Sequence, residues 1–309
     1  MSNIQVQSRI STHQRLRPVH KNPLVTVYRK NLTTLLLPVM LLLTVVSASS
    51  QIVENHDFPK LNSDSLRKEF DKLPLISMYK DNYFVFGCPL NHKPNQENTN
   101  VKFQISLQCK LTKSTLPWNT YLFLYYTQKV FWNVLENSMP MTDLNFNPGI
   151  GVAKPLFSGN RYIGKLSMMI EHESNGRDSI QSRSWNRISF GANIALDQNL
   201  IIHGKFWIPI VDGENNRDLL DYYGLYQMGI QVMTNDRRWK FSEILVKRRG
   251  WRLNYNSVTE VSFRFLRNAD WNLFFQYYNG YGEGLLDYNK FRSQARIGIV
   301  FRPNYFSDY

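Results

Sequence analysis

Alternation of apolar and polar residues is the dominant pattern of the chain after residue 82. It is clearest over residues 101 to 111, where the apolar set is Val101, Phe103, Ile105, Leu107, Cys109 and Leu111 and the polar set is Lys102, Gln104, Ser106, Gln108 and Lys110. Successive side chains of a strand point to opposite faces, so this segment is predicted to be a strand with one apolar face. A soluble sandwich alternates in the same way, and the pattern alone does not name the solvent on the apolar side.

The same pattern predicts twelve strands, at residues 83–88, 101–111, 120–133, 149–157, 163–174, 184–196, 199–210, 223–234, 238–248, 258–267, 270–279 and 292–302. Their connections alternate between short and long, with 112–119 as the exception, because it is longer than a tight turn. An even strand number and alternating turns and loops are typical of bacterial outer-membrane barrels. We therefore predict an all-β fold, a 12-stranded antiparallel transmembrane β-barrel over residues 83–309, preceded by an irregular periplasmic lead-in at 49–82.

Residues 1 to 48 have the features of an export signal. A basic stretch precedes the apolar run from Leu35 to Val46, and the small residues Ser47 and Ala48 suit cleavage after Ala48. A membrane anchor is the alternative, although the apolar run is short for a span. Either interpretation predicts export.

Composition narrows the function classes. The chain has 309 residues, 43% of them hydrophobic and 14% aromatic, yet no segment of the mature part approaches the ~20 apolar residues of a spanning helix. The net charge of +13 is scattered over strands and loops without a basic helix or RNA-binding motif, so no nucleic-acid partner is expected. The positive charge is typical of the water-filled interior and rims of a barrel, and it would also attract anionic lipid headgroups. Cys88 and Cys109 could pair in an oxidising envelope, and neither has a metal-site spacing.

One predicted hairpin contains a base, a nucleophile and an amide. By parity, His172 and Ser174 continue the apolar stripe of Leu166, Met168 and Ile170, and Asn186 continues that of Ile188, Phe190, Ala192, Ile194 and Leu196. In a membrane barrel these stripes face lipid, so the three polar groups are expected near the extracellular edge of the hydrocarbon belt. Symmetric pairing about the 175–183 loop brings His172 close to Asn186. Ser174 lies about 6.6 Å of strand rise from His172, within reach if the strand bends.

The roles of these residues follow from proton chemistry. A serine hydroxyl becomes a good nucleophile when a base takes its proton, and the base works best when a third group holds its tautomer. Ser174 is thus the predicted nucleophile, His172 the base and Asn186 the orienting group. Because an amide steadies an imidazolium less than a carboxylate does, further help for the oxyanion is expected from a metal or from backbone N–H groups. The alternative is a glycine-containing loop with a histidine at the aqueous interface.

The chain resembles the outer membrane phospholipase A family. The resemblance rests on the segments from His172 to Arg177 and from Ser182 to Arg187, with similar matches at Tyr126-Thr127-Gln128, Asn145-Phe146-Asn147-Pro148, Gly280-Tyr281-Gly282-Glu283 and Asp287-Tyr288-Asn289. It implies a twelve-stranded outer-membrane barrel, a phospholipase A1/A2 that hydrolyses acyl esters of membrane phospholipids and is activated by Ca²⁺ and by dimerisation. It also implies that Ser174, His172 and Asn186 are catalytic.

The resemblance further implies a calcium site shared between two subunits. Its ligands would be the Arg177 carbonyl, Ser182, and Ser138 from a second copy, an oxygen-only set that suits Ca²⁺. Gln128 shares its parity with Leu122 and Leu124, and an amide facing lipid is costly unless it is bonded, so pairing of two Gln128 side chains across a homodimer is predicted. A strand bulge that turns Gln128 inward is the alternative.

The competing functional class is a non-catalytic outer-membrane barrel, either a pore or a structural protein. A pore needs a wide lumen, whereas a twelve-stranded barrel encloses a narrow one. The polar side chains expected to fill it are Lys102, Gln104, Glu171, Arg264 and Arg296. A secreted soluble esterase is a third reading, and the chain lacks the Gly-x-Ser-x-Gly elbow of that class.

Overall fold

The computed structural model describes residues 68, 71–72, 74–112, 116–158, 161–210, 215–266, 269 and 271–302. The predicted signal peptide at 1–48 and most of the predicted lead-in at 49–82 lie outside these residues. Within the described ranges, no helix is long and apolar enough to cross a membrane.

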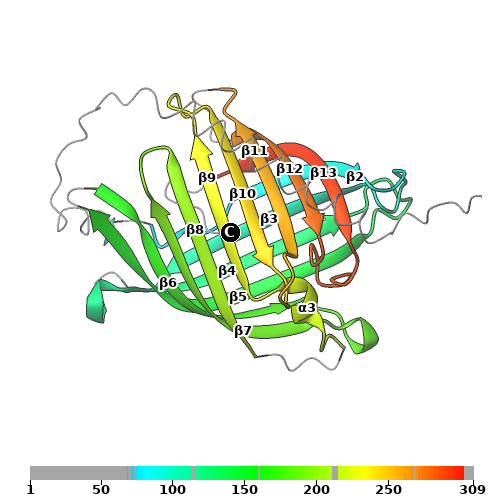
Figure 1. The fold of residues 1–309 in the computed structure, drawn as a ribbon, viewed down its shortest axis with the longest axis horizontal. Coiled ribbons are helices and arrows are strands. Elements are labelled where there is room, and N and C mark those ends of the chain that lie inside the picture. The colour runs from blue at the N-terminus through cyan, green and yellow to red at the C-terminus, as the bar shows by residue number, and fades with distance from the viewer. Residues whose placement is uncertain are drawn as a thin grey trace, which may run out of the picture. The chain divides into compact units, whose positions relative to one another are not determined.

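Twelve antiparallel strands, β2 to β13, close into a barrel in which each strand pairs with its sequence neighbours and β13 pairs with β2 (Figure 1). Their bounds are β2 Asn82–Pro89, β3 Asn100–Lys110, β4 Tyr121–Trp132, β5 Met141–Ser158, β6 Arg161–Ser174, β7 Ser184–Ala195, β8 Leu200–Ile210, β9 Tyr226–Met233, β10 Trp239–Lys247, β11 Tyr255–Phe263, β12 Trp271–Gly280 and β13 Arg292–Phe301. Closure pairs the edge strands with each other, so neither keeps a row of unpaired backbone groups. The predicted fold class and strand number are confirmed.

Several local predictions were wrong, including the bounds of β9, which begins at Tyr226 rather than 223, and of β11, which spans Tyr255–Phe263 rather than 258–267. Strand β5 begins at Met141 rather than at residue 149, because its first half pairs with β4 on one side and, at Phe146, with β6 on the other. A short strand β1, Ile76–Met78, pairs with the part of β3 beyond its ladder with β2, in a segment predicted to be irregular. A one-turn helix α3, Leu219–Tyr223, fills the end of the long connection predicted before the strand at 223–234, where no helix was predicted. Each of these elements depends on a partner distant in sequence, which local periodicity does not report.

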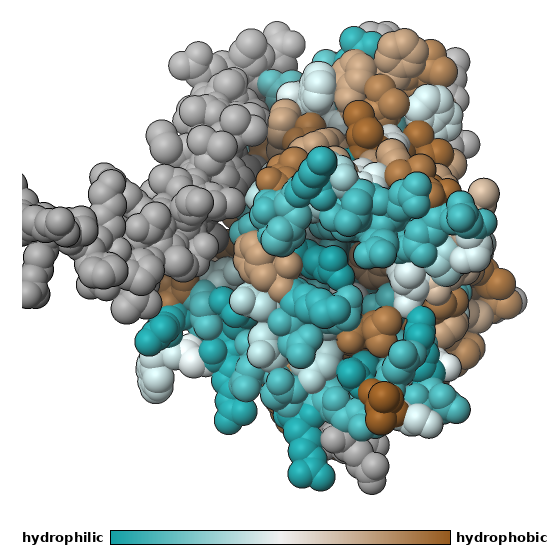
Figure 2. Space-filling view, turned by 90° about the vertical axis from the view of Figure 1, so that its right-hand side faces the viewer, coloured by the Kyte–Doolittle hydropathy of each residue, from teal (hydrophilic) through white to brown (hydrophobic). Residues whose placement is uncertain are grey.

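The barrel is apolar outside and polar inside. On β6, Ile170 is 56% exposed, whereas its neighbour Glu171 on the opposite face is 4% exposed. Leu166 and Met168 continue the outer stripe. An outward apolar band around a polar interior is the arrangement expected when the solvent outside is hydrocarbon. Figure 2 looks onto the right-hand end of Figure 1 and shows hydrophilic side chains across that end, with apolar surface beside it.

Ion pairs and amides fill the interior. Lys102 Nζ and Arg296 Nη1 lie 3.1 and 2.6 Å from Glu283 Oε1, and all three side chains are buried. The predicted interior positions of Lys102, Glu171 and Arg296 are confirmed, and Gln104 donates a 2.8 Å bond to the Asp81 carbonyl. The prediction for Arg264 was wrong: it is exposed beyond the end of β11. Paired charges of this kind satisfy one another away from water.

The antiparallel topology gathers alternate connections at the same end of the barrel. The long-loop end carries the connections at 90–99, 133–140, 175–183, 211–225, 248–254 and 281–291, the fourth of which contains α3 (Figure 1). The opposite end carries those at 111–120, 159–160, 196–199, 234–238 and 264–270. The alternation holds with the predicted exception before β4 and a second one before β12, where the connection at 264–270 is as long as that at 248–254 because β11 ends earlier than predicted. The predicted site therefore lies at the long-loop end.

Candidate active site

His172 on β6 and Asn186 on β7 lie directly opposite each other in the antiparallel ladder. His172 Nδ1 and Asn186 Oδ1 are 2.8 Å apart. Because the amide oxygen only accepts, the imidazole donates from Nδ1, which leaves Nε2 with a lone pair free to accept a proton. The predicted pairing across the hairpin is confirmed, and both residues extend the outer apolar stripes of their strands.

Ser174 is the last residue of β6 and lies opposite Ser184. It is half-buried and occupies the same face of the strand as the exposed His172. Within the described part of the chain, no hydrogen bond joins the Ser174 hydroxyl to His172. Catalytic hydrogen bonds are often long before substrate binds, so two side chains on one face without a direct bond are compatible with a nucleophile and its base.

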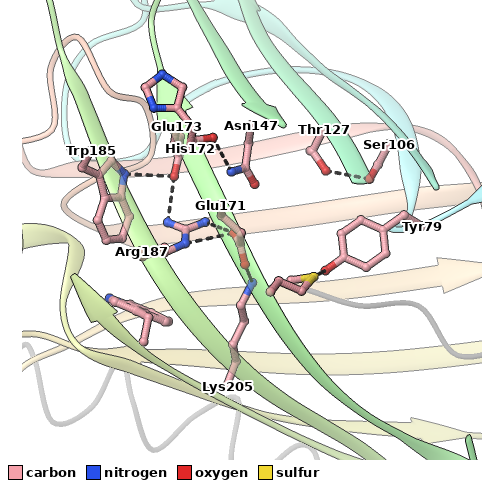
Figure 3. Close-up of polar contacts among 12 residues, drawn as sticks. Tyr79, Ser106, Thr127, Asn147, Glu171, His172, Glu173, Trp185, Arg187 and Lys205 are labelled. Atoms are coloured by element: carbon pink, nitrogen blue, oxygen red, sulfur yellow. Dashed lines mark hydrogen bonds and ion pairs between the residues drawn. The ribbon is translucent and has the colours of Figure 1, made fainter. Parts of the chain in front are cut away.

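The backbone of His172 is held from the other side by β5. The β5–β6 register pairs Phe146 with Ser174 and Gly149 with Glu171, which places Pro148 opposite His172. Proline has no amide N–H to donate. Asn147 Nδ2 donates to the His172 carbonyl instead, at 2.8 Å (Figure 3). Sequence reasoning gave Asn147 no role, and the proline beside it was the available signal.

The loop at 175–183 is organised by the Asn175 side chain. Its Oδ1 accepts the amide N–H groups of Arg177 and Arg183, at 3.3 and 3.0 Å, and its Nδ2 donates to the Gln181 carbonyl at 2.8 Å. Gly176 has φ +65, in the left-handed region that favours glycine. A Cβ at Gly176 would also come within 2.9 Å of the Phe146 ring. The loop geometry is therefore set by residues of the motif itself.

The predicted metal ligands lie in two loops of the long-loop end. Arg177 and Ser182 belong to the 175–183 loop, and Ser138 is exposed in the 133–140 connection. The Arg177 guanidinium donates to the Thr142 carbonyl at 2.6 Å, and the Ser182 amide donates to the Ser179 carbonyl at 3.1 Å. In the described part of the chain, no hydrogen bond reaches the Arg177 carbonyl or the Ser182 hydroxyl. No hydrogen bond joins Ser138 to either residue there.

A buried charge cluster lies behind the site, on the inner face of β6, β7 and β8. The Arg187 guanidinium contacts Glu171 Oε2 through Nη2 at 2.6 Å and Glu173 Oε2 through Nη1 at 2.9 Å. Lys205 Nζ lies 2.6 Å from Glu171 Oε1, and Trp185 Nε1 donates to Glu173 Oε2 at 3.1 Å. Figure 3 shows Glu171 and Glu173 on β6 meeting Arg187 of β7, while Lys205 reaches Glu171 from β8. Parity also put Glu173 and Arg187 on the face opposite the apolar stripes, but of this cluster only Glu171 was named among the side chains expected to fill the interior.

The 281–291 loop carries further residues of the motifs singled out above. Although burial alone would raise the pKa of Glu283, Arg296 and Lys102 lower it to about 2. Burial, together with a hydrogen bond to Asp218, raises the pKa of the Tyr288 hydroxyl. The Leu285 amide donates to Asn145 Oδ1 at 3.1 Å, which ties this loop to β5.

Comparison with known proteins identifies the family. The profile of the family described as phospholipase A1 matches residues 67–301. The chain belongs to the phospholipase A1 family. Curated phospholipases A1 of Salmonella typhimurium and Escherichia coli are each 28% identical over 286 residues, which cover 86% of this chain and 96% of each relative.

Solved structures of the phospholipase A1 family share the barrel. The outer membrane phospholipase A of Escherichia coli matches with a TM-score of 0.64 and 26% identity, covering 74% of this chain and 99% of that one. The Salmonella typhi outer membrane phospholipase dimer with bound calcium matches with a TM-score of 0.64 and 27% identity, covering 73% and 91%. An active-site mutant of the Escherichia coli protein, in which an asparagine is replaced by alanine, matches with a TM-score of 0.64 and 25% identity, covering 81% and 95%.

This member of the phospholipase A1 family is thus an outer-membrane-type barrel with the proposed chemistry on its outer face. The structure brings His172 and Asn186 into hydrogen-bond contact and puts Ser174 on the same face. The expected metal ligands of one chain share a loop that begins directly after Ser174. Among the described residues, no group of three or more His, Cys, Asp or Glu side chains could hold a metal ion.

Proposed function

We propose that this protein is a calcium-dependent phospholipase A1/A2 of the bacterial outer membrane, which hydrolyses acyl ester bonds of phospholipids with Ser174, His172 and Asn186. The observation that carries the proposal is the 2.8 Å contact between His172 Nδ1 and Asn186 Oδ1 on the apolar outer face of the barrel. An ester group of a lipid reaches that face without leaving the membrane. The site's place at the long-loop end supports access from the extracellular leaflet, and residues 1–48 would serve as the export signal.

Each stage of the chemistry passes one proton through His172, which takes it from the nucleophile and gives it to the leaving group. With Nδ1–H held by Asn186, His172 Nε2 takes the proton of the Ser174 hydroxyl as the oxygen attacks the ester carbonyl. The imidazolium then returns that proton to the leaving alcohol, and water releases the fatty acid by the same route. Asn186 strengthens its bond as His172 becomes charged, which favours the transition state over the ground state. The asparagine active-site mutant of the Escherichia coli relative supports a role for an amide in such a site.

The oxygen atoms near Ser174 fit a calcium ion. Ca²⁺ prefers carbonyl, hydroxyl and carboxylate oxygens. The Arg177 carbonyl and the Ser182 hydroxyl have no hydrogen-bond partner within the described residues, and both would hold the ion together with Ser138 of a second subunit. Calcium, when bound, supplies positive charge that stabilises the developing oxyanion. The Salmonella typhi relative with bound calcium supports this assignment.

Dimerisation through the face that carries Gln128 would complete the site. In the ladder, Gln128 lies between Ile105, which is 47% exposed on the outside, and Phe146. Directly paired residues share a face, so Gln128 points outward, and the strand irregularity lies further along, at Phe131. Its Oε1 already accepts a 3.1 Å hydrogen bond from the Tyr126 hydroxyl. The amide nitrogen of Gln128 would donate to an acceptor on a second copy of the chain. The dimeric Salmonella typhi relative supports an active homodimer.

Fatty-acid release from phospholipid–detergent micelles tests the proposal. Purified protein should release fatty acid with calcium and lose that activity with a chelator. His172→Ala and Ser174→Ala should both be inactive while remaining folded, because neither side chain belongs to the interior. A folded, calcium-loaded protein that releases no fatty acid would favour the competing class, a non-catalytic barrel.

A further inference from the structure

Arg187 joins the two residues that flank His172. Glu171 and Glu173 precede and follow the histidine on β6, and their side chains point into the barrel on the face opposite to it. One guanidinium contacts both: Nε and Nη2 reach Glu171 at 2.9 and 2.6 Å, and Nη1 reaches Glu173 at 2.9 Å. The three ionic side chains are at most 11% exposed, so these bonds form away from bulk water.

Arg187 also follows Asn186 directly on β7. In the ladder Arg187 lies opposite Glu171, next to the pair formed by Asn186 and His172. The guanidinium therefore spans the inner face behind the His172–Asn186 pair and joins a side chain of β7 to two side chains of β6. The planar fork of arginine suits this task, because it donates in several fixed directions at once.

The surrounding contacts hold Arg187 in place. Its guanidinium lies over the Trp185 ring, 4.3 Å from the centroid. Lys205 takes the other oxygen of Glu171 at 2.6 Å, and the Trp185 indole donates to Glu173 at 3.1 Å. With two carboxylates and two cations, the cluster is balanced in charge, and every member has a partner (Figure 3).

We propose that Arg187 is a positioning residue for hydrolysis, which sets the geometry of the His172–Asn186 pair from inside the barrel by bridging Glu171 and Glu173. The inference rests on the proposed function, since it needs His172 to be the base. Arg187 touches neither lipid nor the reacting atoms, and acts only through the two strands. A shift of about 1 Å in a catalytic group can cost up to about 100-fold in rate, so modest loosening of the ladder is measurable.

Arg187→Lys is the decisive variant, because it keeps the buried charge and removes the fork that reaches two carboxylates. We expect kcat to fall about tenfold, with KM and the calcium midpoint unchanged, because no substrate or metal contact is lost. The matched control is Arg296→Lys. Arg296 lies on β13, is 2% exposed and bridges Glu283 and Asn100. The Arg296→Lys variant therefore loses a comparable buried guanidinium bridge on a strand that does not carry the site.

A double-mutant cycle with Asn186→Ala separates positioning from general stability. If Arg187 acts through the His172–Asn186 pair, Arg187→Lys should lower kcat less than about twofold in the Asn186→Ala background. If Arg187→Lys acts on the whole barrel instead, the two losses of kcat should multiply. Folding is followed by the shifted gel migration of a folded barrel without heating. If Arg187→Lys does not fold, Glu173→Gln loosens one arm of the bridge and is put through the same cycle.

The outcomes are distinct. Full activity in Arg187→Lys, multiplicative losses in the cycle, or an equal loss in Arg296→Lys would each overturn the positioning role. Activity in Ser174→Ala would instead overturn the proposed function. A tenfold loss of kcat in Arg187→Lys that disappears in the Asn186→Ala background, with Arg296→Lys near wild type, is the result we expect.

Discussion

Replacing Asn186 with alanine removes the oxygen that accepts the His172 Nδ1–H bond at 2.8 Å. During turnover His172 carries a positive charge, and a hydrogen bond to a charged group contributes about 1.5–3 kcal/mol. At about 1.36 kcal/mol per tenfold in rate, loss of this bond should lower kcat by about 10- to 160-fold. KM should change little, because the bond gains strength only as the transition state forms.

Asn186 is half-exposed on the outer face, so this substitution leaves no cavity inside the barrel. The assay is fatty-acid release from micelles at saturating calcium, with gel migration as the measure of folding. Asn186→Asp is the matched control, since a carboxylate accepts the same N–H bond and should retain more activity than alanine. The reasoning fails if kcat of Asn186→Ala stays within about twofold of wild type, or if it drops as far as that of Ser174→Ala.

Three further predictions concern the nucleophile, the loop and a buried carboxylate. Ser174→Ala should abolish fatty-acid release and leave barrel migration on gels unchanged; wild-type turnover would exclude Ser174 as the nucleophile. Gly176→Ala should strain the 175–183 loop by about 1–2 kcal/mol, because φ is +65 and the new Cβ would press on Phe146. Activity should fall and depend less on calcium, as a calcium titration would detect. Glu283 has a folded pKa of about 2 against an ordinary 4.5, so its pairing with Arg296 stabilises the fold fully above about pH 4.5 and loses that effect as pH falls toward 2. Melting temperatures between about pH 5 and pH 3 should therefore fall less in Glu283→Gln than in wild type, and equal slopes would contradict the assignment.

Much of the fold followed from local periodicity. Alternation is a property of neighbouring residues, so the sequence predicted which face of β6 carries Ile170 and His172 and which carries Glu171. Periodicity failed for the first half of β5, where Pro148 and the polar residues around it resemble a loop. There the strand persists because β4 and β6 pair with it on both sides, and an asparagine side chain donates where proline cannot.

The sequence by itself determined which side chains are the candidates for catalysis and on which face of its strand each one lies. Side-chain parity within a strand needs no knowledge of the partner strand, and it placed His172, Ser174 and Asn186 on apolar stripes. Symmetry about the 175–183 loop also brought His172 close to Asn186. Only the tertiary structure decided the register of β5 against β6, which sets Pro148 opposite His172, and the closed interior in which one arginine bridges two carboxylates. These features depend on distances between strands. Pairing and closure of the whole barrel set those distances, and the order of residues along a single strand does not.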